Sequence, residues 1–114
     1  MCSSDLYAFD VQSDGSLKNK RRFVKLREPE QGSLGLRSRA DGMALDSKGR
    51  LYVATASGVQ VIDAHGEYHG TIRVPAVVRN VAFGGPRRQT LYMTALESLY
   101  RVQVLSEGPS GRAK

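Results

Sequence analysis

The sequence contains a single cysteine, Cys2, which excludes an internal disulfide bond and a cysteine-rich zinc site. No apolar run approaches the roughly 20 residues that a membrane-spanning helix needs, and the opening Met-Cys-Ser-Ser-Asp does not resemble a signal peptide. No stretch of about ten residues shows helical periodicity. We therefore expect a soluble all-β protein without a membrane partner. The compartment stays open, with the cytoplasm favoured over the periplasm.

Basic side chains outnumber acidic ones, 17 to 11, which gives a net charge of +6. Six of the ten residues from 18 to 27 are lysine or arginine. Such a cluster is typical either of a nucleic-acid-binding surface or of a solvated hairpin whose charges prevent pairing between sheet edges. The charges are not interleaved with a series of stacking aromatic side chains, as single-strand binders require. We therefore predict the hairpin and no nucleic-acid partner.

A block of three short segments occurs twice, about forty residues apart. The first copy comprises 42–46, 51–55 and 59–63, and the second comprises 80–84, 91–95 and 99–102. A repeat of this length built from short strands predicts β-propeller blades. In such a fold the loops that lead into the innermost strands lie at the mouth of the central channel, so repeat position indicates which residues can reach a ligand.

The middle of the chain is expected to form four antiparallel strands, at 43–46, 51–55, 59–63 and 68–74. Pro75 ends this unit, because proline cannot donate to a strand ladder. The next unit repeats the first three strands, at 81–83, 91–95 and 99–104. Upstream, the expected strands are 6–10 and 22–26, with an Asp14-Gly15 hairpin turn between them and a loop at 28–39.

These strands predict a partial β-propeller of about two to two and a half blades. The outer half of a blade is expected at 6–27, a complete blade at 41–75 and a three-stranded last blade at 79–105. Even four blades need roughly 160–180 residues, so a chain of 114 residues cannot close. We favour a piece of a larger protein over self-assembly. Its open edges predict aggregation or marginal stability in isolation.

The candidate chemistry lies where the chain enters the innermost strands. Asp41 and Arg79 occupy equivalent positions when the two repeats are superposed on Ala44 and Ala82. A carboxylate at the channel mouth can coordinate a hard cation or act as a general base. Gly42 would let a ligand or ion approach closely. The alternative is an Asp-Gly turn whose side chain bonds nearby backbone amides.

Other polar and repeated residues are expected to have structural roles. Three aspartates adjoin glycine-containing turns and are predicted to stabilise them: Asp14, Asp46 and Asp63. The two histidines have no partner at metal-ligand spacing and are predicted to be surface residues: His65 and His69. Four repeated or apolar residues are predicted to pack in the core: Met43, Tyr52, Tyr92 and Met93.

The blocks 41–46, 48–54 and 58–63, followed by 80–85 and 90–95, resemble the gluconolactonase-like family, also called the senescence-marker-protein or regucalcin family. The resemblance covers about residues 6 to 104. It implies a six-bladed propeller of which this chain is the C-terminal portion, with the N-terminal blades needed for closure.

The resemblance also implies a site. Family members hold one divalent cation through a glutamate, an asparagine and the aspartate of the Asp-Gly-Met block, which carries over to Asp41. The other two ligands come from segments that this chain does not contain. The family reaction hydrolyses a sugar lactone, with Asp41 as metal ligand and as base for the attacking water, and with Arg79 and Asn80 lining the channel as substrate-binding residues. The resemblance does not distinguish Ca²⁺, Zn²⁺, Mg²⁺ and Mn²⁺.

Three functional hypotheses follow. The first is a fragment of a metal-dependent lactone hydrolase, active in the full-length parent and inactive as the isolated chain. The second is a non-catalytic propeller that binds calcium or another ligand. The third is an inactive truncated gene product. Fold alone does not choose among them, because propellers have many activities.

Overall fold

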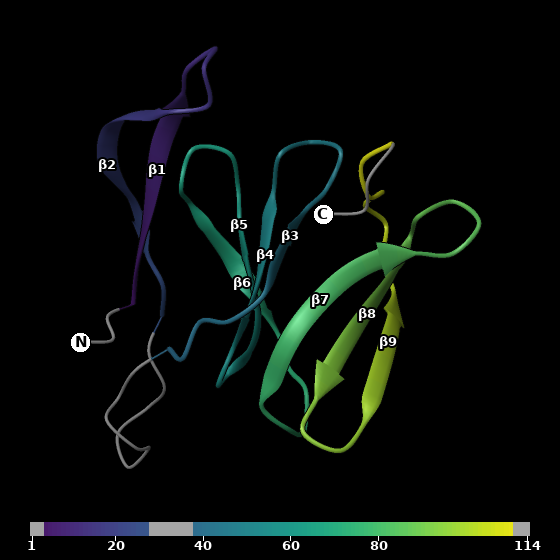
Figure 1. The fold of residues 1–114 in the computed structure, drawn as a ribbon. Coiled ribbons are helices and arrows are strands. Elements are labelled where there is room, and N and C mark those ends of the chain that lie inside the picture. Colours follow the sequence, from purple (N-terminus) through teal and green to yellow (C-terminus); the bar gives the residue numbers. More distant parts are fainter. Residues whose placement is uncertain (1–3, 28–37, 111–114) are drawn as a thin grey trace.

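The computed structural model describes residues 4–27 and 38–110, and these residues form three antiparallel sheets arranged one after another along the chain (Figure 1). Within these residues there is no α-helix, and hence none that is long and apolar enough to cross a membrane. The all-β, partial-propeller prediction is confirmed. The expected loop at 28–39 lies mostly outside the described residues, as does Cys2.

Each sheet contains consecutive strands in chain order. The first is a hairpin of β1 (Asp5–Val11) and β2 (Leu17–Lys25). The middle sheet contains β3 (Met43–Leu45), β4 (Leu51–Thr55), β5 (Gly58–Ile62) and β6 (Tyr68–Ile72). The last sheet contains β7 (Val78–Gly84), β8 (Thr90–Ala95) and β9 (Leu99–Gln103). The assignment of these sheets to blades with the boundaries given above stays a prediction.

The turns explain why the strands reverse where they do. Asp46 Oδ1 accepts hydrogen bonds of 2.9 Å from the amides two and four positions later, and Asp63 Oδ1 does the same at 2.8 and 3.0 Å. The glycines within these turns, Gly49 and Gly66, have φ angles of 78° and 88° that favour a residue without a Cβ. Asp14 similarly accepts from an amide two positions later, at 2.9 Å. The turn prediction for all three aspartates is confirmed.

The core consists of two apolar layers on opposite faces of the middle sheet. Tyr52 and Ala54 face the last sheet, whereas Val53 between them faces the first hairpin. This is the alternation that a strand imposes on successive side chains. The Tyr52 ring meets the edge of Phe83 with centroids 5.0 Å apart and planes at 86°. The period of two therefore lets the middle sheet pack against the last sheet on one face and against the first hairpin on the other.

Three expectations were wrong in detail. Met93 is buried, but Met43 is 38% exposed, because Ala44 takes the core-facing position of β3 and its neighbour must point away. The second strand begins at Leu17 rather than Arg22, since a tight turn brings the chain into register with Val11. The inner strand β7 begins at Val78 rather than residue 81, because its pairing with β8 extends to Ala95.

Open surfaces remain at both ends of the series of sheets. Within the described residues, no fourth strand pairs with β9. Leu99 on this strand is 66% exposed, and Tyr7 and Phe9 on β1 are also exposed. Uncovered strand edges and apolar side chains of this kind are sites of association. Aggregation of the isolated chain stays a prediction that these surfaces support.

Candidate active site between the middle and last sheets

Backbone hydrogen bonds of Asp41 and Gly42 tie this segment to two sheets. The Asp41 N–H donates to Ala54 O at 3.0 Å, and the amide of Ala54 donates to Gly42 O at 2.9 Å. The amide of Gly42 then donates to Arg79 O in the neighbouring sheet at 2.8 Å. Asp41 therefore precedes β3 at the point where the inner strands β3 and β7 approach each other.

Gly42 permits this close approach, but the space that it leaves is filled by protein. A Cβ on residue 42 would overlap Asn80 Oδ1 and lie 2.9 Å from Asn80 Cα. The expectation that the missing side chain makes room for a ligand or ion was therefore wrong in this respect. The glycine is required because the side chain of the next sheet's inner strand packs against its backbone.

The structure brings the three predicted site residues together. Arg79 and Asn80 lie within β7, and Arg79 Nη1 lies 3.7 Å from Asp41 Oδ2. The side chains of Arg79 and Asp41 are 54% and 50% exposed, so water screens the pair and it contributes at most about 1 kcal/mol. The carboxylate and the guanidinium are thus adjacent but only loosely held, and both remain available to a ligand.

Asn80 has a backbone contact that fits its structural interpretation. Its Oδ1 accepts a hydrogen bond of 2.9 Å from the amide of Val81. A shallow hollow of about 140 Å³ lies beside it, lined by Asn80, Val81, Ala82, Tyr92 and Thr94. Tyr92 lines this hollow although its repeat partner Tyr52 is buried in the core. The role of Asn80 in substrate binding stays a prediction.

The described residues do not form a complete metal site. Across 4–27 and 38–110, no three His, Cys, Asp or Glu side chains gather in a metal-binding group. Asp41 has the right chemistry for one ligand, since hard cations prefer oxygen ligands such as carboxylates, and Ca²⁺ takes six to eight oxygen ligands in all. Arg79 adds a positive charge beside that carboxylate, which opposes a cation there. A cation bound by Asp41 would therefore need further ligands, from water or from residues beyond those described.

A second polar cluster lies at the other end of β3, around Asp46. The Asp46 side chain is fully enclosed, and its Oδ2 accepts from Arg50 Nε at 2.7 Å and from the Tyr52 hydroxyl at 3.2 Å. Ser106 Oγ accepts from Arg50 Nη2 at 2.9 Å and from the Tyr52 hydroxyl at 3.0 Å. The turn motif predicted Asp46 as a turn residue, but no local signal indicated Ser106, because it lies 56 residues from Arg50.

The titration of these groups follows from their contacts. Burial by itself raises the pKa of Asp46, but hydrogen bonds from Arg50 and Lys48 and the charge of Arg50 outweigh it, so the pKa lies below its usual value. Burial raises the pKa of Tyr52. A hydrogen bond from His69, 2.8 Å away, and backbone amides lower the pKa of Asp63 to about 2. Asp46 and Asp63 are therefore ionised at neutral pH and act as acceptors.

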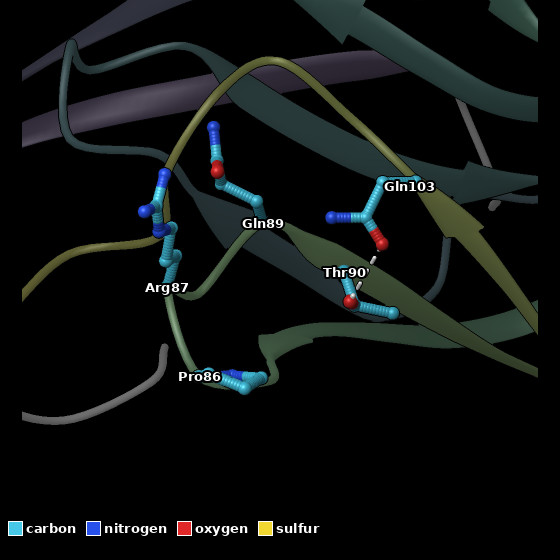
Figure 2. A pocket seen from close by; sticks show the side chains of 5 residues that line it. All are labelled: Pro86, Arg87, Gln89, Thr90 and Gln103. Atoms are coloured by element: carbon cyan, nitrogen blue, oxygen red, sulfur yellow. Dashed lines mark hydrogen bonds between the residues drawn. The ribbon is translucent and has the colours of Figure 1, made fainter.

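A second hollow, of about 270 Å³, lies at the far end of the last sheet (Figure 2). It is lined by Pro86, Arg87, Gln89, Thr90 and Gln103. Figure 2 shows Thr90 beside Gln103, and the Thr90 hydroxyl donates to Gln103 Oε1 at 3.2 Å. This hollow follows the end of β7, whereas Arg79 and Asn80 lie at its beginning, so roughly 20 Å of strand separates the two places. It is not part of the Asp41 site.

Comparison with known proteins identifies the family. The sequence model of the SMP-30/Gluconolactonase/LRE-like region matches residues 2–97. The pentonolactonase XacC of Haloferax volcanii is 38% identical over 91 residues, which are 77% of this chain and 28% of that protein. Human regucalcin is 31% identical over 96 residues, 81% of this chain and 29% of its own. The chain therefore spans less than a third of the length of these curated relatives.

Solved structures of proteins from this family also match the chain. A luciferin-regenerating enzyme matches with a TM-score of 0.72 and 28% identity, over 94% of this chain and 40% of its own. A gluconolactonase from Xanthomonas campestris matches with a TM-score of 0.61 and 25% identity, over 87% of this chain and 29% of its own. Because the sequence model covers most of the chain and these relatives share its strands, the chain belongs to the SMP-30/gluconolactonase/LRE-like family.

Proposed function

We propose that this chain is part of a lactone hydrolase that acts on a sugar lactone, and that Asp41 is its principal contribution to the site. The family supports this assignment, since relatives are named pentonolactonase, gluconolactonase and lactonohydrolase. The observation that carries it is the placement of the half-exposed Asp41 carboxylate beside Arg79, where the inner strands of two sheets meet.

The proposed roles follow from the chemistry of the side chains. Asp41 accepts the proton of the attacking water, and the backbone bonds that Asp41 and Gly42 make to two sheets keep the carboxylate in place. Arg79 donates hydrogen bonds to ring oxygens of the lactone or to the carboxylate of the product. Asn80 contributes its amide N–H groups beside it. A divalent cation, with Asp41 as one of its ligands, would supply polarisation of the lactone carbonyl when bound.

The second candidate function is a propeller that binds a ligand without catalysis. It is favoured by one observation, that Arg79 is already paired with the Asp41 carboxylate. A carboxylate paired to a guanidinium can position an ion or a polar ligand without activating water. The two functions differ in whether removing the charge of Asp41 abolishes turnover.

A graft tests the proposal, because the matched segment of the Haloferax volcanii pentonolactonase can be replaced by residues 4–110 of this chain. We expect the graft to hydrolyse a pentonolactone in a pH-stat assay. Asp41→Asn should lower kcat by at least about 100-fold, whereas Asp63→Asn, in an exposed turn, should not change it. An active graft that tolerates Asp41→Asn would refute the proposal. A folded but inactive graft would favour the binding function.

A further inference from the structure

Backbone hydrogen bonds hold the residues that directly follow β9. Residues 104–108, here called the strap, bond to the last sheet and to the middle sheet. The amide of Val104 donates to Gln89 O at 2.9 Å, and the amide of Gly108 donates to Arg88 O at 2.7 Å. In the middle sheet, the amide of Ser47 donates to Glu107 O at 2.7 Å. Figure 1 shows this segment between the β3–β4 turn and the last sheet.

Side chains reinforce the backbone contacts on both sides. Ser106 Oγ accepts from Arg50 Nη2 at 2.9 Å and from the Tyr52 hydroxyl at 3.0 Å, so the strap completes the cluster around Asp46. Gly108 is buried against Phe83, where a Cβ would lie 2.5 Å from Phe83 Cβ and 2.9 Å from Phe83 Cγ. The strap therefore has specific partners in each sheet rather than a general apolar contact.

The strap acts on the strand that positions Asp41. β3 contains only three residues, and within the described residues it pairs with β4 alone. Asp41 precedes this strand and Asp46 follows it, so the two lie about 17 Å apart at most. At the Asp41 end, contact with the last sheet is made by Gly42 and Arg79. At the Asp46 end, it is made by the strap together with Tyr52, whose ring meets Phe83.

We propose that the strap, residues 104–108, fixes the middle sheet against the last sheet at the far end of β3, and thereby sets the position of Asp41 relative to Arg79. Ser106 and Asp46 are then positioning residues for a carboxylate that neither of them touches. The inference rests on the proposed function only in taking Asp41 as the functional carboxylate. The mechanical coupling itself does not depend on any reaction.

Hydrogen exchange of backbone amides tests the coupling in the graft of residues 4–110 described above. Ser106→Ala removes the acceptor for Arg50 and Tyr52, Ser106→Thr restores a hydroxyl, and Ser110→Ala is the matched control in an exposed position. We expect Ser106→Ala to speed exchange of the Ser47, Gly108 and Gly42 amides by about tenfold, with amides of the β5–β6 pair unchanged. Ser106→Thr should restore protection, and Ser110→Ala should have no effect.

Two results would overturn the proposal. If the Gly42 amide keeps its protection while Ser47 and Gly108 lose theirs, the strap is an attachment that does not reach Asp41. If all amides, including those of β5 and β6, exchange faster by the same factor, Ser106 contributes only to global stability. Gly108→Val gives a second readout through its overlap with Phe83, and it should reproduce the local pattern of Ser106→Ala. Failure of the lactonase assay alone leaves these exchange results unaffected.

Discussion

Replacing Asp46 by asparagine removes the charge of an enclosed carboxylate while nearly keeping its shape. In the wild type, Oδ1 accepts from two backbone amides at 2.9 Å, and Oδ2 accepts from Arg50 Nε at 2.7 Å and from the Tyr52 hydroxyl at 3.2 Å. The amide oxygen of asparagine can keep the two backbone bonds. Its NH₂ group must then face Arg50 Nε, so a charge-assisted bond is replaced by two opposed donors.

The expected loss follows from that exchange. A hydrogen bond to a charged partner contributes about 1.5–3 kcal/mol, and breaking a buried ion pair costs about 3–5 kcal/mol. Because Arg50 is partly exposed, its guanidinium can turn to water in the variant. The loss should therefore lie nearer the value for a single hydrogen bond than that for a fully buried ion pair. We expect Asp46→Asn to lower the free energy of unfolding by about 2–3 kcal/mol, or the melting temperature by roughly 10–15 °C.

Urea unfolding monitored by far-UV circular dichroism and tyrosine fluorescence measures this loss, since the sequence has five tyrosines and no tryptophan. Asp63→Asn is the matched control, because Asp63 makes the same two backbone bonds in an exposed turn. It should shift the midpoint much less. Equal midpoint shifts for the two variants would refute the argument, because enclosure of the Asp46–Arg50 pair would then have no energetic consequence.

Three further predictions test other contacts. Gly42→Val should lower the free energy of unfolding by about 1–3 kcal/mol, because its side chain must displace Asn80; a wild-type urea midpoint would contradict the packing described. Gln60→Ala should cost about 1–3 kcal/mol by leaving the backbone N–H and C=O of Arg27 without their partner, with loss of β1–β2 amide protection as the measure. Because the pKa of Asp63 is about 2 when folded, its contribution is complete above about pH 4 and is lost between pH 4 and 2; urea midpoints of Asp63→Asn should therefore fall less steeply over that range than those of the wild type.

The sequence predicted which residues belong to the candidate site but not how those residues are arranged in space. Repeat position selected Asp41 and Arg79 as equivalent, and the structure places them 3.7 Å apart. Equivalence in a repeat says that two residues occupy the same place in their own sheets. It does not say that their side chains meet, which depends on the angle between the sheets. That Asn80 fills the space beside Gly42 depends on the same angle.

Local chemistry determined the strands and turns. The pattern of residues 51–55 predicted a strand, and Asp-containing turns with glycine predicted where strands end, because these signals act over a few residues of backbone. Met43 shows the limit of such reasoning, since an apolar residue in a three-residue strand is buried or exposed according to which neighbour takes the core position.

The sequence by itself therefore determined the class of the fold, the order of its strands and the family to which they belong. Only the tertiary structure decided which distant residues share a cluster. Ser106 meets Tyr52 across 54 positions of the chain, and Gln60 meets Arg27 across 33. No short-range pattern encodes such contacts, because they form only after each sheet has buried one face against the next, and it is that packing which brings their donors and acceptors within bonding distance.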